Sequence, residues 1–208
     1  MKSLLHEDAG SSPASAWRPN GSRFNQKTWL FDLDNTLHNA SAHIFPRIHV
    51  SMMAYICRHL NVDEAEATRL RQTYWKRYGA TLLGMMRHHG TDPRHFLQQT
   101  HAFDDLASMV VSERGLKQML QRLPGRKIIF SNAPQQYTEA VLALTGIRRH
   151  FAAVYPVERF RFQPKPATAG FLHLLHKERL DPRACIMVED SSHNLIPAKR
   201  LIANVEGA

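Results

Sequence analysis

The chain has 208 residues, enough for one domain with a small insertion, and its 43% hydrophobic and 22% charged residues are typical of globular proteins. This composition excludes a wholly disordered or fibrous chain. No apolar stretch approaches the roughly 20 residues that a bilayer span needs, which excludes a membrane protein. The net charge of +9 favours anionic partners such as nucleic acid or a phosphate ester.

Residues 1–26 are rich in Ser, Ala, Pro, Gly and Asn and show no periodicity, so we expect a disordered leader. The ordered part begins with the apolar run Thr28–Phe31, which predicts a buried strand that ends at Asp32 and Asp34. From residue 41 to residue 122 the pattern is helical. This predicts an all-helical cap inserted after the first strand.

Capping signals divide this helical segment. Asn61 or Asp63 begins a helix that Gly79 ends, because side chains of this type cap helix N-termini and glycine is favoured just past a C-terminus. Asp92 followed by Pro93 suits the N-cap and first position of another helix. We therefore expect several helices in the cap.

After the cap, short apolar strands alternate with helical patterns. The predicted strands are Lys127–Phe130, Ala152–Tyr155 and Cys185–Val188, and the predicted helices are Pro134–Leu144 and Thr168–Lys177. Such alternation is typical of a parallel sheet covered by helices on both faces. We assign the fold class α/β, with a Rossmann-like parallel sheet core made of residues 27–40 and 123–208 and the helical cap at 41–122.

Polar residues follow the predicted strands, where ligands bind in open parallel sheets. They are Asp32, Asp34, Ser131, Asn132, Glu189 and Asp190, and the extended segment at 163–166 adds Lys165. Carboxylates crowded at one point raise one another's pKa unless a cation is present. Mg²⁺ prefers oxygen ligands and takes one or two carboxylates together with substrate phosphate. The sequence therefore predicts Mg²⁺ and a phosphate at one site.

Four segments carry a resemblance to the motifs of the haloacid dehalogenase-like (HAD) hydrolase superfamily. They are Asp32–Leu37, Ser131–Asn132, Lys165–Pro166 and Val188–Ser191, in the order of the superfamily motifs. Two further segments, Leu37–Ala40 and Tyr78–Gly90, resemble the helical-cap pyrimidine 5′-nucleotidase group.

The resemblance implies that Asp32 is the nucleophile and forms an aspartyl-phosphate. It implies that Asp34 protonates the leaving alkoxide and then activates water. Residue chemistry supports this division independently, because two carboxylates separated by one residue reach one edge and can differ in pKa through their environments. The expected catalytic residues are therefore Asp32, Asp34, Ser131 and Lys165.

The resemblance further implies that Ser131 and Lys165 bind the phosphoryl oxygens. We also count Asn132 as a substrate-binding candidate, although it can equally orient Asp32 or form a turn. The expected metal ligands are Asp32, Asp190 and the backbone carbonyl of Asp34, with Glu189 a direct or water-mediated helper. Candidate substrate contacts from the cap, each of which equally fits a surface position, are His43, Arg47, Tyr78 and Arg87.

The leading functional hypothesis is a Mg²⁺-dependent phosphomonoesterase acting on a small phosphorylated metabolite, by resemblance UMP or CMP. A nucleic-acid surface is disfavoured, because the basic residues are scattered without dense runs or interleaved aromatics. A 2-haloacid dehalogenase is disfavoured too, because halide leaves without a proton and needs neither Asp34 nor Mg²⁺. Only two cysteines are present and no secretory signal precedes the first strand, so we expect a cytoplasmic protein.

A third hypothesis is a truncated, weakly active or non-catalytic protein of the same fold. Relatives place a further strand after the last helix, but here Leu195–Leu201 is followed only by residues 202–208. We therefore predict that the C-terminal edge strand is missing. Loss of that strand would expose Cys185–Val188 as an apolar edge, which predicts weakened metal binding, low stability or a homodimer through this edge.

Overall fold

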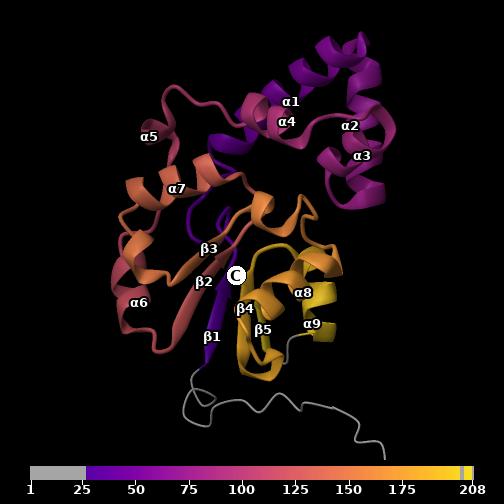
Figure 1. Ribbon diagram of the computed structural model, residues 1–208. Coiled ribbons are helices and arrows are strands. Elements are labelled where there is room, and N and C mark those ends of the chain that lie inside the picture. Colours follow the sequence, from indigo (N-terminus) through magenta and orange to yellow (C-terminus); the bar gives the residue numbers. More distant parts are fainter. Residues whose placement is uncertain (1–26, 202–203, 208) are drawn as a thin grey trace, which may run out of the picture.

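The computed structural model describes residues 27–201 and 204–207, and the predicted leader at 1–26 lies outside them (Figure 1). Within these described residues, five parallel strands form one sheet in the order β3-β2-β1-β4-β5. They are β1 Thr28–Phe31, β2 Arg126–Phe130, β3 Ala153–Tyr155, β4 Cys185–Glu189 and β5 Asn204–Gly207. The predicted α/β fold with a parallel sheet is confirmed.

The prediction of a missing C-terminal edge strand is wrong. Strand β5 pairs in parallel with β4, with Ile186 opposite Asn204 and Glu189 opposite Gly207. The sequence Asn-Val-Glu-Gly carries no apolar strand pattern, but ladder hydrogen bonds involve the backbone of any non-proline residue and need no such pattern. Because β5 covers the edge of β4, the exposed edge behind the predictions of weak metal binding and dimerisation is not there.

Helices cover both faces of the sheet, and their bounds are α6 Leu116–Arg122, α7 Gln135–Leu144, α8 Thr168–Lys177 and α9 Ser192–Leu201. One face packs Phe31 and Ile129 against α6 and α7, and the other packs Leu30 and Ile128 against α8 and α9. Alternate residues of a strand point to opposite faces, and the apolar residues at both kinds of position, such as Leu30 and Phe31, are buried, so the sheet is covered on both sides. The described part of the core also contains the short 3₁₀ helices η1 Arg148–His150, η2 Val157–Phe160 and η3 Pro182–Ala184.

Ahead of α6, the described helices between β1 and β2 are α1 Ile44–Leu60, α2 Glu64–Tyr78, α3 Thr81–His89, α4 Pro93–Thr100 and α5 Leu106–Met109. Two of the predicted capping signals are confirmed: Asp63 accepts a hydrogen bond from the N–H of Glu66, and Gly79 ends α2 with a φ of 77°. Asn61 does not begin this helix; it ends α1, with a φ of 52°. Helix α4 begins at Pro93, with Asp92 as its N-cap. Among the described helices, none is both long and apolar enough to cross a membrane.

Helices α1 to α4 lie beyond the carboxyl ends of the strands (Figure 1). Helix α6 does not belong with them, although it falls inside the range 41–122 expected for the cap. Its Leu116 and Leu120 are buried in the cluster that contains Phe31 and Ile129 of the sheet. The helical segment that faces the carboxyl edge of the sheet therefore ends before α6, and not at residue 122 as expected from the sequence.

Candidate active site

The parallel register of the sheet brings the functional side chains of β1, β2 and β4 to one edge. Phe31 lies opposite both Ile129 of β2 and Val188 of β4, so the three strands end level with one another. The N–H of Asp32 then donates to the carbonyl of Val188 at 3.0 Å, and the N–H of Ser131 to that of Tyr155 at 3.0 Å. These backbone hydrogen bonds fix the positions of Asp32 and Ser131, whose side chains extend from this edge.

Lys165 joins this edge from the loop between β3 and α8. Its Nζ donates to Asp32 Oδ1 at 2.7 Å and to Glu189 Oε2 at 2.6 Å. The side chain is 1% exposed, so the ion triad is almost dry. Asn132 holds the loop in place: its Oδ1 accepts from the N–H of Lys165 at 2.7 Å, and its Nδ2 donates to the carbonyl of Lys165 at 2.9 Å.

Burial and neighbouring charges shift the pKa values of the ionisable groups at this edge. Burial raises the pKa of Asp32 to about 7, because the attraction of Lys165 offsets only part of the desolvation and the charges of Glu189 and Asp34 add to it. Burial would lower the pKa of Lys165, but the two carboxylates in contact outweigh it and raise that pKa. Burial and the neighbouring Glu189 also raise the pKa of Asp190. One lysine therefore does not neutralise the carboxylates at this edge of the sheet.

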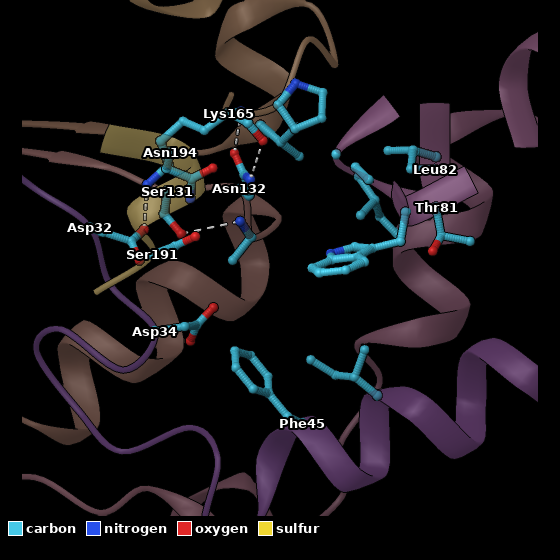
Figure 2. Close-up of a pocket in the computed structure, with 18 of the residues that line it drawn as sticks. Asp32, Asp34, Phe45, Thr81, Leu82, Ser131, Asn132, Lys165, Ser191 and Asn194 are labelled. Atoms are coloured by element: carbon cyan, nitrogen blue, oxygen red, sulfur yellow. Dashed lines mark hydrogen bonds and ion pairs between the residues drawn. The ribbon is translucent and has the colours of Figure 1, made fainter. Parts of the chain in front are cut away.

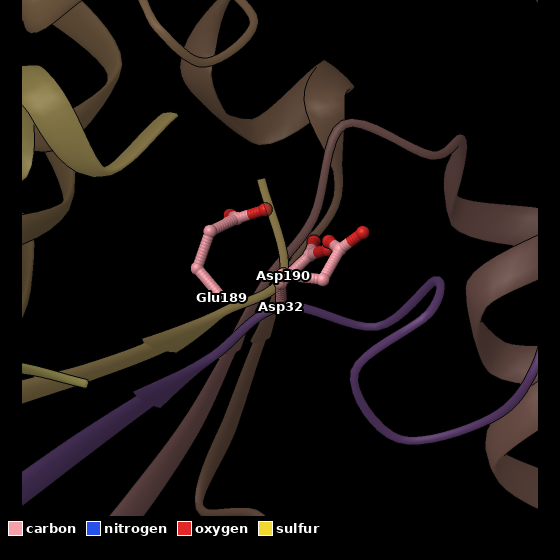
Figure 3. Close-up of side chains that lie close together, drawn as sticks. All are labelled: Asp32, Glu189 and Asp190. Carbon is pink, nitrogen blue, oxygen red and sulfur yellow. The ribbon is translucent and has the colours of Figure 1, made fainter. Parts of the chain in front are cut away.

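A hard cation would supply the missing positive charge, and the donors present fit one. Oxygen atoms of Asp32, Glu189 and Asp190 all lie within 4.8 Å of one another (Figure 3). All three side chains are carboxylates, whose oxygen atoms are donors that Mg²⁺ prefers. Glu189 is already committed, because its Oε1 accepts from the N–H of Ser191 and from Asn194 while its Oε2 accepts from Lys165. Asp32 and Asp190 are therefore the better ligands.

Asp34, the second predicted catalytic carboxylate, is held by two donors that the sequence did not reveal. Its Oδ1 accepts from the hydroxyl of Tyr137 at 2.6 Å and from His38 Nε2 at 2.8 Å. Tyr137 is 2% exposed, and its burial, with Asp34 beside it, raises the pKa of the phenol far above its usual value. Tyr137 thus stays protonated and keeps donating to Asp34.

A cavity of about 400 Å³ opens between the carboxyl edge and the helices above it. Figure 2 shows Asp32, Ser131 and Lys165 on one wall and Thr81 with Leu82 on the opposite wall. All seven residues predicted from the strand ends and the lysine loop line it, so the structure brings together Asp32, Asp34, Ser131, Asn132, Lys165, Glu189 and Asp190.

The cap side of the cavity differs from the sequence-based expectation. None of the four cap candidates, His43, Arg47, Tyr78 and Arg87, is among the described residues that line it. The residues found there instead include Phe45, Arg71, Trp75 and His101. The sequence held no signal for them, because a helical pattern does not show which of its faces looks toward the sheet.

His101 follows the last residue of α4 and lines this cavity. Its ring packs against Tyr137 and Phe103, and its Nδ1 lies 3.2 Å from the carbonyl of Leu97. Burial lowers its pKa from 6.5 to about 4, although Asp34 pulls in the opposite direction.

Between pH 6.5 and pH 4 the unfolded chain therefore binds a proton at His101 that the folded protein does not. We expect the free energy of unfolding to fall by about 2 kcal/mol from this group as the pH drops through that window. His101→Asn should flatten this part of the profile, measured by urea unfolding from pH 4.5 to 7.5. An unchanged slope would contradict a neutral His101.

Comparison with known proteins decides the family. Residues 26–201 match the family described as haloacid dehalogenase-like hydrolase. The chain belongs to this family. A yeast relative, "Phosphate metabolism protein 8" of Saccharomyces cerevisiae, is 24% identical over 139 residues, which are 62% of this chain. The aligned part is 43% of that protein, so the chain spans less than half of its length.

Solved structures of HAD hydrolases share the fold. A predicted phosphoglycolate phosphatase from Haemophilus somnus 129PT has a TM-score of 0.60 at 20% identity, over 90% of this chain and 86% of its own. A HAD phosphatase from Thermococcus onnurineus has a TM-score of 0.56 at 21% identity, over 84% and 82%. L-2-haloacid dehalogenase from Xanthobacter autotrophicus has a TM-score of 0.56 at 18% identity, over 88% and 77%.

Proposed function

We propose that this HAD hydrolase is a Mg²⁺-dependent phosphomonoesterase that acts through an aspartyl-phosphate. The observation that carries the proposal is the pair Asp32 and Asp34, two carboxylates at one cavity in different environments. Asp32 contacts an ammonium group, whereas Asp34 accepts from a phenol and an imidazole. Environments that differ in this way give two carboxylates separate roles.

The proposed reaction has two steps. An oxygen of Asp32 attacks phosphorus, the bond from phosphorus to the ester oxygen breaks, and Asp34 gives its proton to the leaving alkoxide. Asp34 then takes a proton from water, whose oxygen attacks the aspartyl-phosphate and releases inorganic phosphate and the Asp32 carboxylate. Oδ1 of Asp34 is occupied by Tyr137 and His38, which leaves Oδ2 to carry the proton.

The other residues bind and orient. Ser131 is 1% exposed at the end of β2, and its Oγ accepts from the N–H of Ala133 at 3.1 Å, so its own hydroxyl proton is available to a phosphoryl oxygen. Lys165 adds positive charge beside the attacking carboxylate. Asp32 and Asp190 would hold Mg²⁺, with the Asp34 carbonyl and Glu189 assisting; when bound, the ion neutralises phosphate charge.

The named relatives support a phosphatase more than a dehalogenase. The yeast relative is named for phosphate metabolism, and two of the structural neighbours carry the name phosphatase. The dehalogenase neighbour shares the fold, but halide departs without a proton and has no use for a carboxylate held as Asp34 is. The hypothesis of a weakly active or non-catalytic protein rested on an exposed edge of β4, and β5 pairs with that edge.

We propose pyrimidine 5′-nucleotides, UMP or CMP, or a similar small phosphate ester as substrates. Support comes from the resemblance of the cap segments and from the cavity of about 400 Å³, which suits a small ligand. We propose the reducing cytoplasm as the location, because a chain with only two cysteines offers no disulfide framework.

The test is release of inorganic phosphate from UMP, CMP, ribose 5-phosphate and phosphoglycolate, with Mg²⁺ and with EDTA. We expect hydrolysis that needs Mg²⁺, returns when Mg²⁺ is restored, and is highest for the pyrimidine nucleotides. A 2-haloacid is assayed in parallel for halide release. Faster halide release than phosphate release, or equal phosphate release in EDTA, would rule out the proposed reaction.

A further inference from the structure

One cation in the cap has no role in the chemistry described above. Arg71 of α2 lines the cavity, and its Nε is buried with no hydrogen-bond partner among the described residues. It forms no ion pair there either, whereas Arg69 on the same helix pairs with Glu66. A buried donor without a partner costs about 1–3 kcal/mol, so such a group calls for a ligand.

Arg71 belongs to the wall that faces the phosphate site. The hydroxyl of Thr81 donates to the backbone carbonyl of Arg71 at 3.3 Å, which ties α2 to the start of α3. Figure 2 places Thr81 across the cavity from Asp32 and Lys165. A phosphate bound at the strand ends would therefore leave Arg71 to meet the other end of the substrate.

The same part of the cavity carries aromatic surface that the fold does not use. Trp75 is one helical turn beyond Arg71 and remains 59% exposed, and Phe45 of α1 remains 39% exposed. Large apolar side chains on the wall of a concave site are suited to a flat, apolar ring. The neighbouring cap residues that line the cavity are Ile48, Met52 and Leu82.

We propose that Arg71 determines substrate specificity by donating hydrogen bonds to a ring carbonyl at the end of the substrate opposite its phosphate. This inference rests on the proposed phosphatase and narrows its substrates to phosphate esters with a planar, carbonyl-bearing ring, such as UMP or CMP. Trp75 and Phe45 then pack against the ring. A carboxylate on a short substrate is the weaker match, because it would leave both aromatic rings and much of the cavity without contacts.

The test compares Arg71→Gln with Arg69→Gln, the same substitution on the outer face of the same helix. The substrates are UMP, whose base has carbonyls, AMP, whose base has none, ribose 5-phosphate and phosphoglycolate. For Arg71→Gln we expect kcat/KM on UMP to fall roughly 10- to 100-fold, the loss of a charged hydrogen bond. On AMP and ribose 5-phosphate it should change less than about twofold, and Arg69→Gln should match the wild type on every substrate.

Several results would overturn this inference. An equal loss on ribose 5-phosphate means that Arg71 serves the phosphate or the fold, a larger loss on phosphoglycolate than on UMP means that it binds a second anion, and no loss on UMP means that it does not touch the base. Trp75→Ala, at an exposed position, gives a second variant and should weaken UMP more than ribose 5-phosphate.

Binding separates this inference from the catalytic proposal. If the wild type hydrolyses no phosphate ester, the phosphatase proposal fails, but UMP binding to the Asp32→Asn protein is still measurable by calorimetry. Weaker UMP binding after Arg71→Gln in that background would support the role of Arg71 without any turnover. Absence of UMP binding to the Asp32→Asn protein, together with absence of turnover, would reject it.

Discussion

Asp32→Asn is expected to lower phosphate release from UMP by about four orders of magnitude or more, because an amide cannot form the aspartyl-phosphate. Asp32 contacts Lys165 at 2.7 Å and belongs to the carboxylate cluster that suits Mg²⁺, so the variant loses the nucleophile and one ligand together. The measurement is phosphate release at saturating Mg²⁺. Residual activity within tenfold of the wild type would show that Asp32 is not the attacking group.

The loss can be assigned to chemistry because the variant should stay folded. Asparagine has the shape of aspartate, and Lys165 keeps its second carboxylate partner, Glu189, at 2.6 Å. The substitution also removes a buried carboxylate whose ionisation burial opposes, as its raised pKa shows. We expect a melting temperature close to that of the wild type. When the reaction is quenched with acid during turnover, the wild-type protein should retain bound phosphate and the Asp32→Asn protein should retain none.

The core of the fold and the strand-end half of the site were predictable for one physical reason. Parallel strands end level at one edge, so a residue that follows an apolar run, such as Asp32 or Ser131, can be placed from the sequence alone. Strand β5 could not be predicted in the same way. The sequence around Val205 has no apolar period, and only the backbone ladder with β4 makes it a strand.

The cap half of the cavity was out of reach of sequence patterns. Arg71 and Trp75 share a face of α2, but the buried residues of this helix are Ala67 and Tyr74, so its apolar periodicity does not single out the face of Arg71 and Trp75. Tyr137 reaches Asp34 across 103 positions of the chain, a contact that depends on how α7 packs on the sheet. Asn132 holds the backbone of Lys165, 33 positions along the chain, a contact that its sequence position did not indicate.

Lys165→Met should damage both stability and activity, because Lys165 is the cation between two buried carboxylates. It is 1% exposed, and Asp32 and Glu189 have side chains that are 10% and 1% exposed. Removing one partner of a buried ion pair costs roughly 3–5 kcal/mol, since the remaining charges are left without compensation. We expect a loss of this size in the free energy of unfolding, measured with urea in EDTA at pH 8, and a drop in kcat of about 10³-fold.

The sign of the pH dependence distinguishes charge from lost packing. In Lys165→Met the carboxylate of Asp32, whose pKa is already raised to about 7, loses its cation. Protonation of Asp32 should therefore remove the repulsion between its carboxylate and that of Glu189. The deficit in stability relative to the wild type should therefore shrink as the pH falls from 8 towards 5. Adding Glu189→Gln should recover part of the stability at pH 8 but none of the activity. A deficit that is the same at both pH values and insensitive to Glu189→Gln would mean that Lys165 acts through the volume it fills, and not through its charge.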